Sequence, residues 1–137
     1  MNTPSNENVG QDLPQNLPTA EREVLLLHNP NCSKSRATHA VLEQAGIKFG
    51  VRLYLEQPLS VGELTEVGAR LAKKPREWVR SGQAEYADAG LDANASDEAH
   101  LVAMASSPIL MERPIVLTVT EARIGRPPIC VLDLFES

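Results

Sequence analysis

The sequence predicts an α/β fold in one domain, with a helical insertion between the second and third strands. Two observations favour this prediction. An apolar run near the amino end is followed at once by a segment with helical periodicity, as where a strand leads into a helix. A second apolar run comes only after a series of helix-capping signals, so helices separate the early strands from the late ones. The length of 137 residues is enough to bury one core.

The first three elements are expected in residues 24–54. Residues 24–27 are Val-Leu-Leu-Leu, which is typical of a buried strand. A helix is expected from Ser33 to about Ala45, ended by Gly46, the residue type that most often follows a helix. Residues 47–54 alternate between apolar and polar side chains, which predicts a second strand. The helix face expected to be buried carries Ala37, Ala40, Val41, Gln44 and Ala45.

The insertion and the closing elements are marked by capping residues and prolines. Ser60 and Glu63 have the spacing of a capping box, which predicts a helix to about residue 72. Residues 114–119 and 122–125 predict a hairpin of two late strands. The other segments expected to be helical begin near Pro75, Ser96 and Pro127. This order of elements matches a thioredoxin-like fold.

Composition and charge exclude several classes of protein. The net charge of −5 and the aromatic share of 4% argue against a nucleic-acid surface. The amino end lacks the basic start and apolar stretch of a secretory signal, and no apolar run could cross a bilayer, so we expect a cytoplasmic protein that binds no membrane. Residues 1–22 are polar, which predicts a disordered tail before a folded domain at 23–137.

The segment that carries chemistry surrounds Cys32. This cysteine lies where the first strand passes into the first helix, and the free N–H groups and dipole of a helix start favour a thiolate. The same N–H groups can hold an oxyanion. The residues expected to form a supporting anion loop are Ser33, Lys34, Ser35 and Arg36. The alternative is a structural cysteine buried at a turn.

Spacing around this cysteine narrows the chemistry. Position 35 is a serine, so the Cys-x-x-Cys pair of a dithiol redox site is absent. A phosphatase loop of the Cys-x5-Arg type would need arginine at position 38, which is Thr38. A single-thiol reaction completed by an external thiol therefore fits best. Cys130 lies in an apolar context and is interpreted as a core residue, with a resolving thiol as the alternative.

Two Arg-Pro pairs flank the late strands. Arg113-Pro114 precedes a strand, and this bond is a candidate for a cis peptide. Arg126 precedes Pro127 at a turn, where its planar guanidinium could bind an oxyanion. For each arginine taken alone, the alternative is a solvated surface charge.

From Leu25 to Leu134 the sequence resembles the glutaredoxin-dependent arsenate reductase family. The motifs that carry the resemblance are HNPNCSKSR at 28–36, YLEQP at 54–58, PILMERPIV at 108–116, IGRPP at 124–128 and VLDL at 131–134. The forms CSKSR, MERP and IGRPP are similar to those of a chromosomally encoded, housekeeping branch of that family.

The resemblance implies reduction of arsenate to arsenite through a covalent adduct on Cys32. It further implies glutathione as a co-substrate, glutaredoxin as the partner that reduces the mixed disulfide, and a monomer without a bound cofactor or metal. The family histidine that helps to hold the cysteine as thiolate falls on His28. The three arginines that grip the substrate fall on Arg80, Arg113 and Arg126.

Two other functions stay open on the same fold. One is a single-thiol oxidoreductase that acts on glutathione mixed disulfides. The other is a non-enzymatic module that resembles RNA-polymerase-binding regulators, a group that usually carries Cys-x-x-Cys, and Ser35 argues against it. The joint presence of Arg80, Arg113 and Arg126 favours arsenate over the glutathione alternative.

Overall fold

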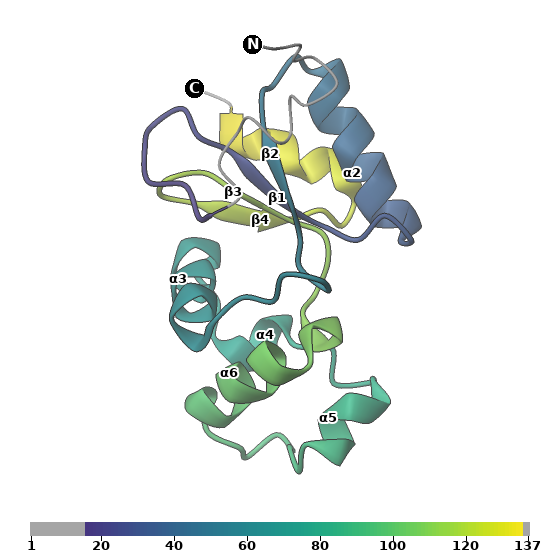
Figure 1. Ribbon diagram of the computed structural model, residues 1–137, viewed down its shortest axis with the longest axis vertical. Coiled ribbons are helices and arrows are strands. Elements are labelled where there is room, and N and C mark those ends of the chain that lie inside the picture. The colour runs from purple at the N-terminus through teal and green to yellow at the C-terminus, as the bar shows by residue number, and fades with distance from the viewer. Residues whose placement is uncertain (1–15, 136–137) are drawn as a thin grey trace. The chain divides into compact units, whose positions relative to one another are not determined.

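The early and late strands form one four-stranded sheet in the computed structural model, which describes residues 16–135 (Figure 1). The strands are β1 (Leu25–His28), β2 (Gly50–Leu53), β3 (Ile115–Leu117) and β4 (Ala122–Ile124). Their order is β2-β1-β3-β4, with β1 parallel to β2 and antiparallel to β3, and with β3 antiparallel to β4. The mixed sheet confirms the predicted α/β class and the predicted hairpin.

Helix α2 (Ser33–Gln44) links β1 to β2, and a crossover of this kind is what allows the two strands to run parallel. Gly46 follows the helix with a φ of 75°, as expected of a glycine in this place. The predicted second strand begins too early, at residue 47. The N–H of Ile47 donates to the Leu42 carbonyl at 3.1 Å, so this residue still belongs to the helix exit. Pairing starts at Gly50, whose N–H donates to the Val24 carbonyl.

The buried face of α2 differs from the predicted one. The prediction placed Ala37 and Gln44 on that face, but both are exposed, whereas Ser35, Thr38 and Leu42 are buried. Two hydroxyl groups can be buried here because each is hydrogen-bonded, as buried polar groups must be. The prediction was wrong because it used apolar spacing alone.

One hydrophobic core lies between this sheet and two helical segments, α2 and the 3-10 helix η3 (Pro128–Phe135). Leu26 and Val116 are paired across neighbouring strands, and both contribute to the core from the sheet. Leu42 enters from α2 and Val131 from η3, so the two helical segments cover the same face, as Figure 1 shows. The last helical piece predicted after Pro127 is thereby confirmed.

Residues 54–112 form the predicted helical insertion, a compact unit of its own. Its helices are α3 (Val61–Leu71), α4 (Pro75–Trp78), α5 (Ala84–Asp88), α6 (Asp97–Ser106) and the 3-10 helix η2 (Pro108–Leu110). The capping box of Ser60 and Glu63 is present in both directions, and Ser96 caps α6. Helix α5 and η2 were not predicted.

A buried histidine joins α5 to α6 inside the insertion. His100 is fully buried, and its Nδ1 lies 2.9 Å from the Ser96 carbonyl, which can only accept. Its Nε2 is therefore the acceptor for the Tyr86 hydroxyl at 3.0 Å. Both ring nitrogens are satisfied, so His100 has a structural part for which the sequence carried no signal.

Most of the predicted tail, residues 1–15, lies outside the described residues. In the part that is described, Pro18 is buried ahead of β1. The Glu23 carboxylate accepts hydrogen bonds from the N–H groups of Thr19 at 2.8 Å and of Ala20 at 3.2 Å. These bonds hold a turn that leads into β1. Within residues 16–135, no helix is long and apolar enough to span a membrane.

Candidate functional site

Cys32 is the N-cap residue of α2 and follows directly on a turn at the end of β1. Its N–H donates to the Asn29 carbonyl at 3.0 Å, and the N–H of Asn31 donates to the Asn29 side-chain oxygen at 3.0 Å. The thiol is free and partly exposed. The turn therefore presents the sulfur at the start of a helix, as the sequence predicted.

Three donors favour the thiolate form of Cys32. Burial acts to raise the pKa of this thiol, but hydrogen bonds from the backbone N–H groups of Ser35 and Lys34 and from the Arg113 guanidinium outweigh it. The pKa of Cys32 is therefore lowered from its ordinary value. The positive charge that acts on the thiol is that of Arg113, whereas Lys34 acts through its backbone N–H.

Arg36 braces the turn before the cysteine. Its Nη1 donates to the Pro30 carbonyl at 2.8 Å, which ties the first turn of α2 to the loop before it. Ser33 is exposed, and Ser35 is fully buried beneath the site. The four residues expected to form an anion loop thus have different surroundings, and the backbone N–H groups of Lys34 and Ser35 lower the pKa of the Cys32 thiol.

His28 lies at the end of β1 with 9% of its surface exposed. Burial lowers the pKa of His28 to about 4, and the nearby charges of His39 and Arg36 act in the same direction. The imidazole is therefore neutral at pH 7 and gives the thiolate no positive charge. Its Nδ1 lies 2.6 Å from the Ser35 hydroxyl oxygen, so its contact with the site runs through Ser35.

This lowered pKa predicts a pH dependence of stability. The unfolded chain takes up the His28 proton near pH 6.5, whereas the folded protein resists it until about pH 4. Stability contributed by neutral His28 is therefore present above pH 6.5 and is lost as the pH falls towards 4. We expect His28→Gln to make the free energy of unfolding less dependent on pH across this window. Urea unfolding at several pH values measures it, and parallel profiles for the two proteins would contradict it.

Arg113 has buried hydrogen-bond donors without partners in the described part of the chain. It precedes Pro114 through a cis peptide bond, as the sequence predicted. Its Nε and Nη1 are buried, and neither has a hydrogen-bond partner among residues 16–135. Buried N–H groups that lack a partner are costly, and those of a guanidinium more so. Because the charge of this guanidinium also helps to lower the pKa of the Cys32 thiol, its unpaired donors indicate a place for an anion near the sulfur.

Arg126 is held against the same segment. The Arg126–Pro127 bond is also cis, which was not predicted. The Arg126 Nε donates to the Arg113 carbonyl at 2.9 Å, and the Gly125 N–H donates to the Pro114 carbonyl at 2.9 Å. The two Arg-Pro segments thus lie side by side. The Arg126 side chain is exposed, whereas Arg113 is partly buried.

Gly125 allows the chain to pass close to the helix that carries Cys32. A Cβ atom at position 125 would lie 2.5 Å from Thr38 Oγ1 and 2.9 Å from Pro114 Cγ. We expect Gly125→Ala to lower the free energy of unfolding by about 1–3 kcal/mol, the usual cost of overpacking. Gly82→Ala is the matched control, since its Cβ would meet nothing within 4 Å. Urea unfolding compares the two, and equal effects would contradict the prediction.

Arg80 lies in the helical insertion. Its N–H donates to the Leu110 carbonyl at 2.7 Å and its Nη1 to the Ile109 carbonyl at 3.3 Å. With the Gln83 amide oxygen facing the guanidinium, that oxygen accepts from Nη2 at 2.8 Å and from Nη1 at 3.2 Å. The guanidinium is held in one orientation by neutral oxygens. Its part in substrate binding stays a prediction.

Cys130 is held within η3, and its thiol donates to the Ile124 carbonyl at 3.1 Å. It is free and partly buried. Cys130 is not among the buried core residues, so its interpretation as a core residue is not confirmed, and a resolving thiol stays the alternative. In the described part of the chain, no group of three His, Cys, Asp or Glu side chains could hold a metal ion.

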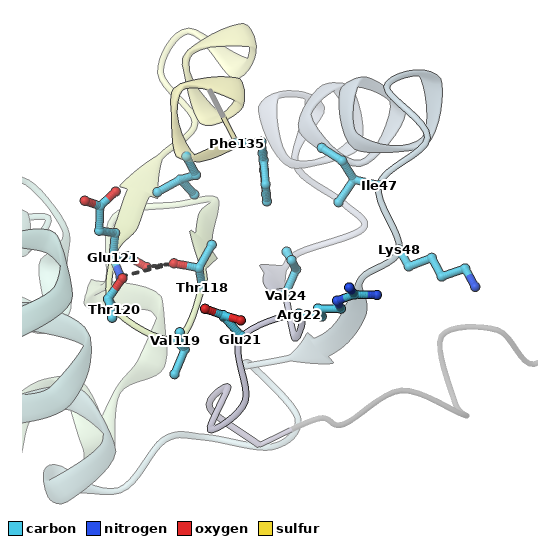
Figure 2. Close-up of a pocket in the computed structure, with 11 residues that line it drawn as sticks. Glu21, Arg22, Val24, Ile47, Lys48, Thr118, Val119, Thr120, Glu121 and Phe135 are labelled. Atoms are coloured by element: carbon cyan, nitrogen blue, oxygen red, sulfur yellow. Dashed lines mark hydrogen bonds between the residues drawn. The ribbon is translucent and has the colours of Figure 1, made fainter. Parts of the chain in front are cut away.

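A separate groove of about 620 Å³ lies at the opposite end of the sheet (Figure 2). Val24, Ile47 and Phe135 line it with apolar side chains, next to the hairpin residues 118–121. Val24 precedes β1, whereas Cys32 follows the end of the same strand. The groove contains none of the residues predicted for the site.

Comparison with known proteins shows the family of the chain. The model of the ArsC family matches residues 27–134, which include Cys32, Arg113 and Arg126. The chain belongs to the ArsC family. An arsenate reductase of Haemophilus influenzae is 40% identical over 113 residues, with 81% of this chain and 97% of that protein covered. An uncharacterized Escherichia coli protein, YfgD, is 42% identical and covers 82% of this chain and 97% of its own length.

Solved structures of this family support the fold. A putative arsenate reductase from Yersinia pestis is 46% identical with a TM-score of 0.76, and 80% of this chain and 98% of that chain are covered. An arsenate reductase from Vibrio cholerae is 44% identical with a TM-score of 0.77, with 81% and 96% covered. The ArsC fold is thioredoxin-like, so the predicted fold is confirmed together with its helical insertion.

Proposed function

We propose that this ArsC-family protein is an oxidoreductase that reduces arsenate to arsenite, with Cys32 as the nucleophile. The observation that supports this most is the pair of buried, unpartnered Arg113 donors beside a cysteine whose pKa is lowered. Arsenate is a tetrahedral oxyanion that a guanidinium can bind through two oxygens at once. Relatives at about 40% identity bear the name arsenate reductase, which supports the same substrate.

In the proposed reaction the Cys32 thiolate attacks arsenic(V). A bond from sulfur to arsenic forms, and one arsenate oxygen leaves as water after protonation. Glutathione then supplies the second thiol. Two electrons pass from the two sulfurs to arsenic, which departs as arsenite, and the sulfurs are left as a mixed disulfide. Glutaredoxin reduces that disulfide and restores Cys32. No step calls for a metal or a bound cofactor.

The side chains divide the work in this proposal. The backbone N–H groups of Lys34 and Ser35 stabilise the thiolate before attack and the charge on the departing oxygens afterwards. Arg113 orients the oxyanion through its two free donors. Arg126 and Arg80 are proposed as further anion ligands from the resemblance. We expect the protein to be a cytoplasmic monomer and glutaredoxin to bind it in that form.

A coupled assay tests the proposal. Arsenate, glutathione, glutaredoxin, glutathione reductase and NADPH are mixed with the protein, and NADPH oxidation and arsenite formation are both followed. Arsenate-dependent oxidation matched by arsenite is the expected result, with phosphate in place of arsenate as the blank. If the protein instead transfers thiols to a small glutathione mixed disulfide and produces no arsenite, the function is deglutathionylation and the proposal is wrong.

A further inference from the structure

Ser35 is the point where three parts of the reactive loop meet. It is fully buried in the first turn of α2. Its hydroxyl oxygen accepts the Asn29 N–H at 3.0 Å and lies 2.6 Å from His28 Nδ1. Its backbone N–H is one of the groups at the start of α2 that lower the pKa of the Cys32 thiol. One residue of the first turn of α2 thus contacts both the end of β1 and the turn that precedes the nucleophile.

The hydrogen-bond chemistry of this group fixes the state of His28. The Asn29 N–H can only donate, so the hydroxyl oxygen accepts there. The hydroxyl also has a proton to donate, and a neutral His28 can accept it at Nδ1, 2.6 Å away. We assign this arrangement, in which Nδ1 carries no hydrogen and the imidazole proton is on Nε2. A neutral histidine in this tautomer accepts a hydrogen bond from Ser35 and supplies no positive charge.

We propose that the Ser35 hydroxyl is a positioning group for the Cys32 nucleophile. By tying Asn29 and His28 to the first turn of α2, it closes the loop 29–35 around the cysteine and keeps the Lys34 and Ser35 N–H groups directed at the sulfur. Without the hydroxyl the turn can move away from the helix, and these two donors lose their alignment. The alignment of the thiolate exists before a substrate binds. The inference therefore rests on the proposed function only where it concerns arsenate turnover.

Charge around the sulfur stays constant when Ser35 is changed, which makes the inference testable. The charged or titratable groups near the loop are Lys34 and Arg36 on α2, His39 one turn later, His28 on β1 and Arg113 before β3. Substitution of Ser35 by alanine removes none of them. A change in the pH at which Cys32 ionises would therefore come from donor alignment and not from loss of charge.

The experiment follows alkylation of Cys32 by iodoacetamide against pH in a Cys130→Ser background. Ser35→Ala is expected to move the transition in alkylation rate to higher pH. A transition one pH unit higher makes alkylation at low pH about tenfold slower. Thr65→Ala is the control, since it removes an exposed helix hydroxyl, in α3, that belongs to no predicted site, and its profile is expected to be unchanged. A Ser35→Ala profile that overlies that of the parent would overturn the inference.

Two further measurements keep the outcome unambiguous. If Ser35→Ala does not fold, His28→Ala replaces it, since it removes one of the two hydroxyl contacts and is expected to move the transition less far in the same direction. An unmoved transition in that variant would overturn the inference. Absence of arsenate turnover in the unaltered protein would contradict the proposed function and not the alkylation result. Normal turnover with an unmoved Ser35→Ala profile would contradict the inference alone.

Discussion

Replacement of Cys32 by serine is expected to reduce arsenate-dependent turnover below detection while the fold is kept. Serine has nearly the same size, but its hydroxyl stays protonated at neutral pH and is a far weaker nucleophile. The fold should persist because Cys32 is the N-cap residue of α2, a position that serine favours. The coupled assay measures turnover, and circular dichroism with thermal unfolding checks the fold.

Cys130→Ser is the control for that result. The Cys130 thiol donates to the Ile124 carbonyl, and a serine hydroxyl can make the same bond, so most of the activity should remain. A loss as severe as that of Cys32→Ser would show that Cys130 takes part as a resolving thiol. The single-thiol mechanism would then be wrong.

Arg113→Lys is expected to lower kcat/KM for arsenate by about a hundredfold or more. Removal of one donor from a preorganised anion site has an effect on this order. The Arg113 guanidinium helps to lower the pKa of the thiol and has buried Nε and Nη1 donors without partners among the described residues, whereas a lysine ammonium is a point charge without this planar set of donors. Arsenate-dependent NADPH oxidation at several arsenate concentrations separates the effect on KM from that on kcat.

Two comparisons make this result specific. Arg126→Lys should also impair arsenate turnover but less, since the Arg126 side chain is exposed and its Nε already donates to a carbonyl. Thiol transfer to a small mixed disulfide should survive both changes when it is measured at a pH where Cys32 is ionised in every protein. If arsenate turnover survives Arg113→Lys, or thiol transfer falls in parallel, arsenate is not what Arg113 binds.

Local signals in the sequence were sufficient for most of the fold. The apolar strand at β1, the capping box of Ser60 and Glu63, and the cap at Ser96 each appear where they were expected. Such features depend on neighbours in the chain, so they can be predicted from spacing. Helix α5 was missed because it has only five residues and none of them is buried, so it leaves no periodic pattern.

The site was predictable only in part, for a physical reason. The position of Cys32 at a strand-to-helix junction follows from local sequence. The burial of Ser35 and Thr38 does not, because it depends on distant segments: Ser35 contacts His28 of β1, and the chain passes close to Thr38 at Gly125. Apolar spacing therefore selected the wrong face of α2. That Arg113 has donors without partners depends on three-dimensional packing, and no pattern of residue types reports it.

The bond between Arg126 Nε and the Arg113 carbonyl makes the two arginines interdependent. One side chain helps to fix the backbone from which the other projects, and the neighbouring Gly125–Pro114 hydrogen bond fixes the same backbone. Residues connected in this way do not contribute independently, and the effects of their substitutions do not add. The loss of activity measured for a substitution of either arginine therefore includes part of the contribution of the other. Only a double-mutant cycle separates the two contributions.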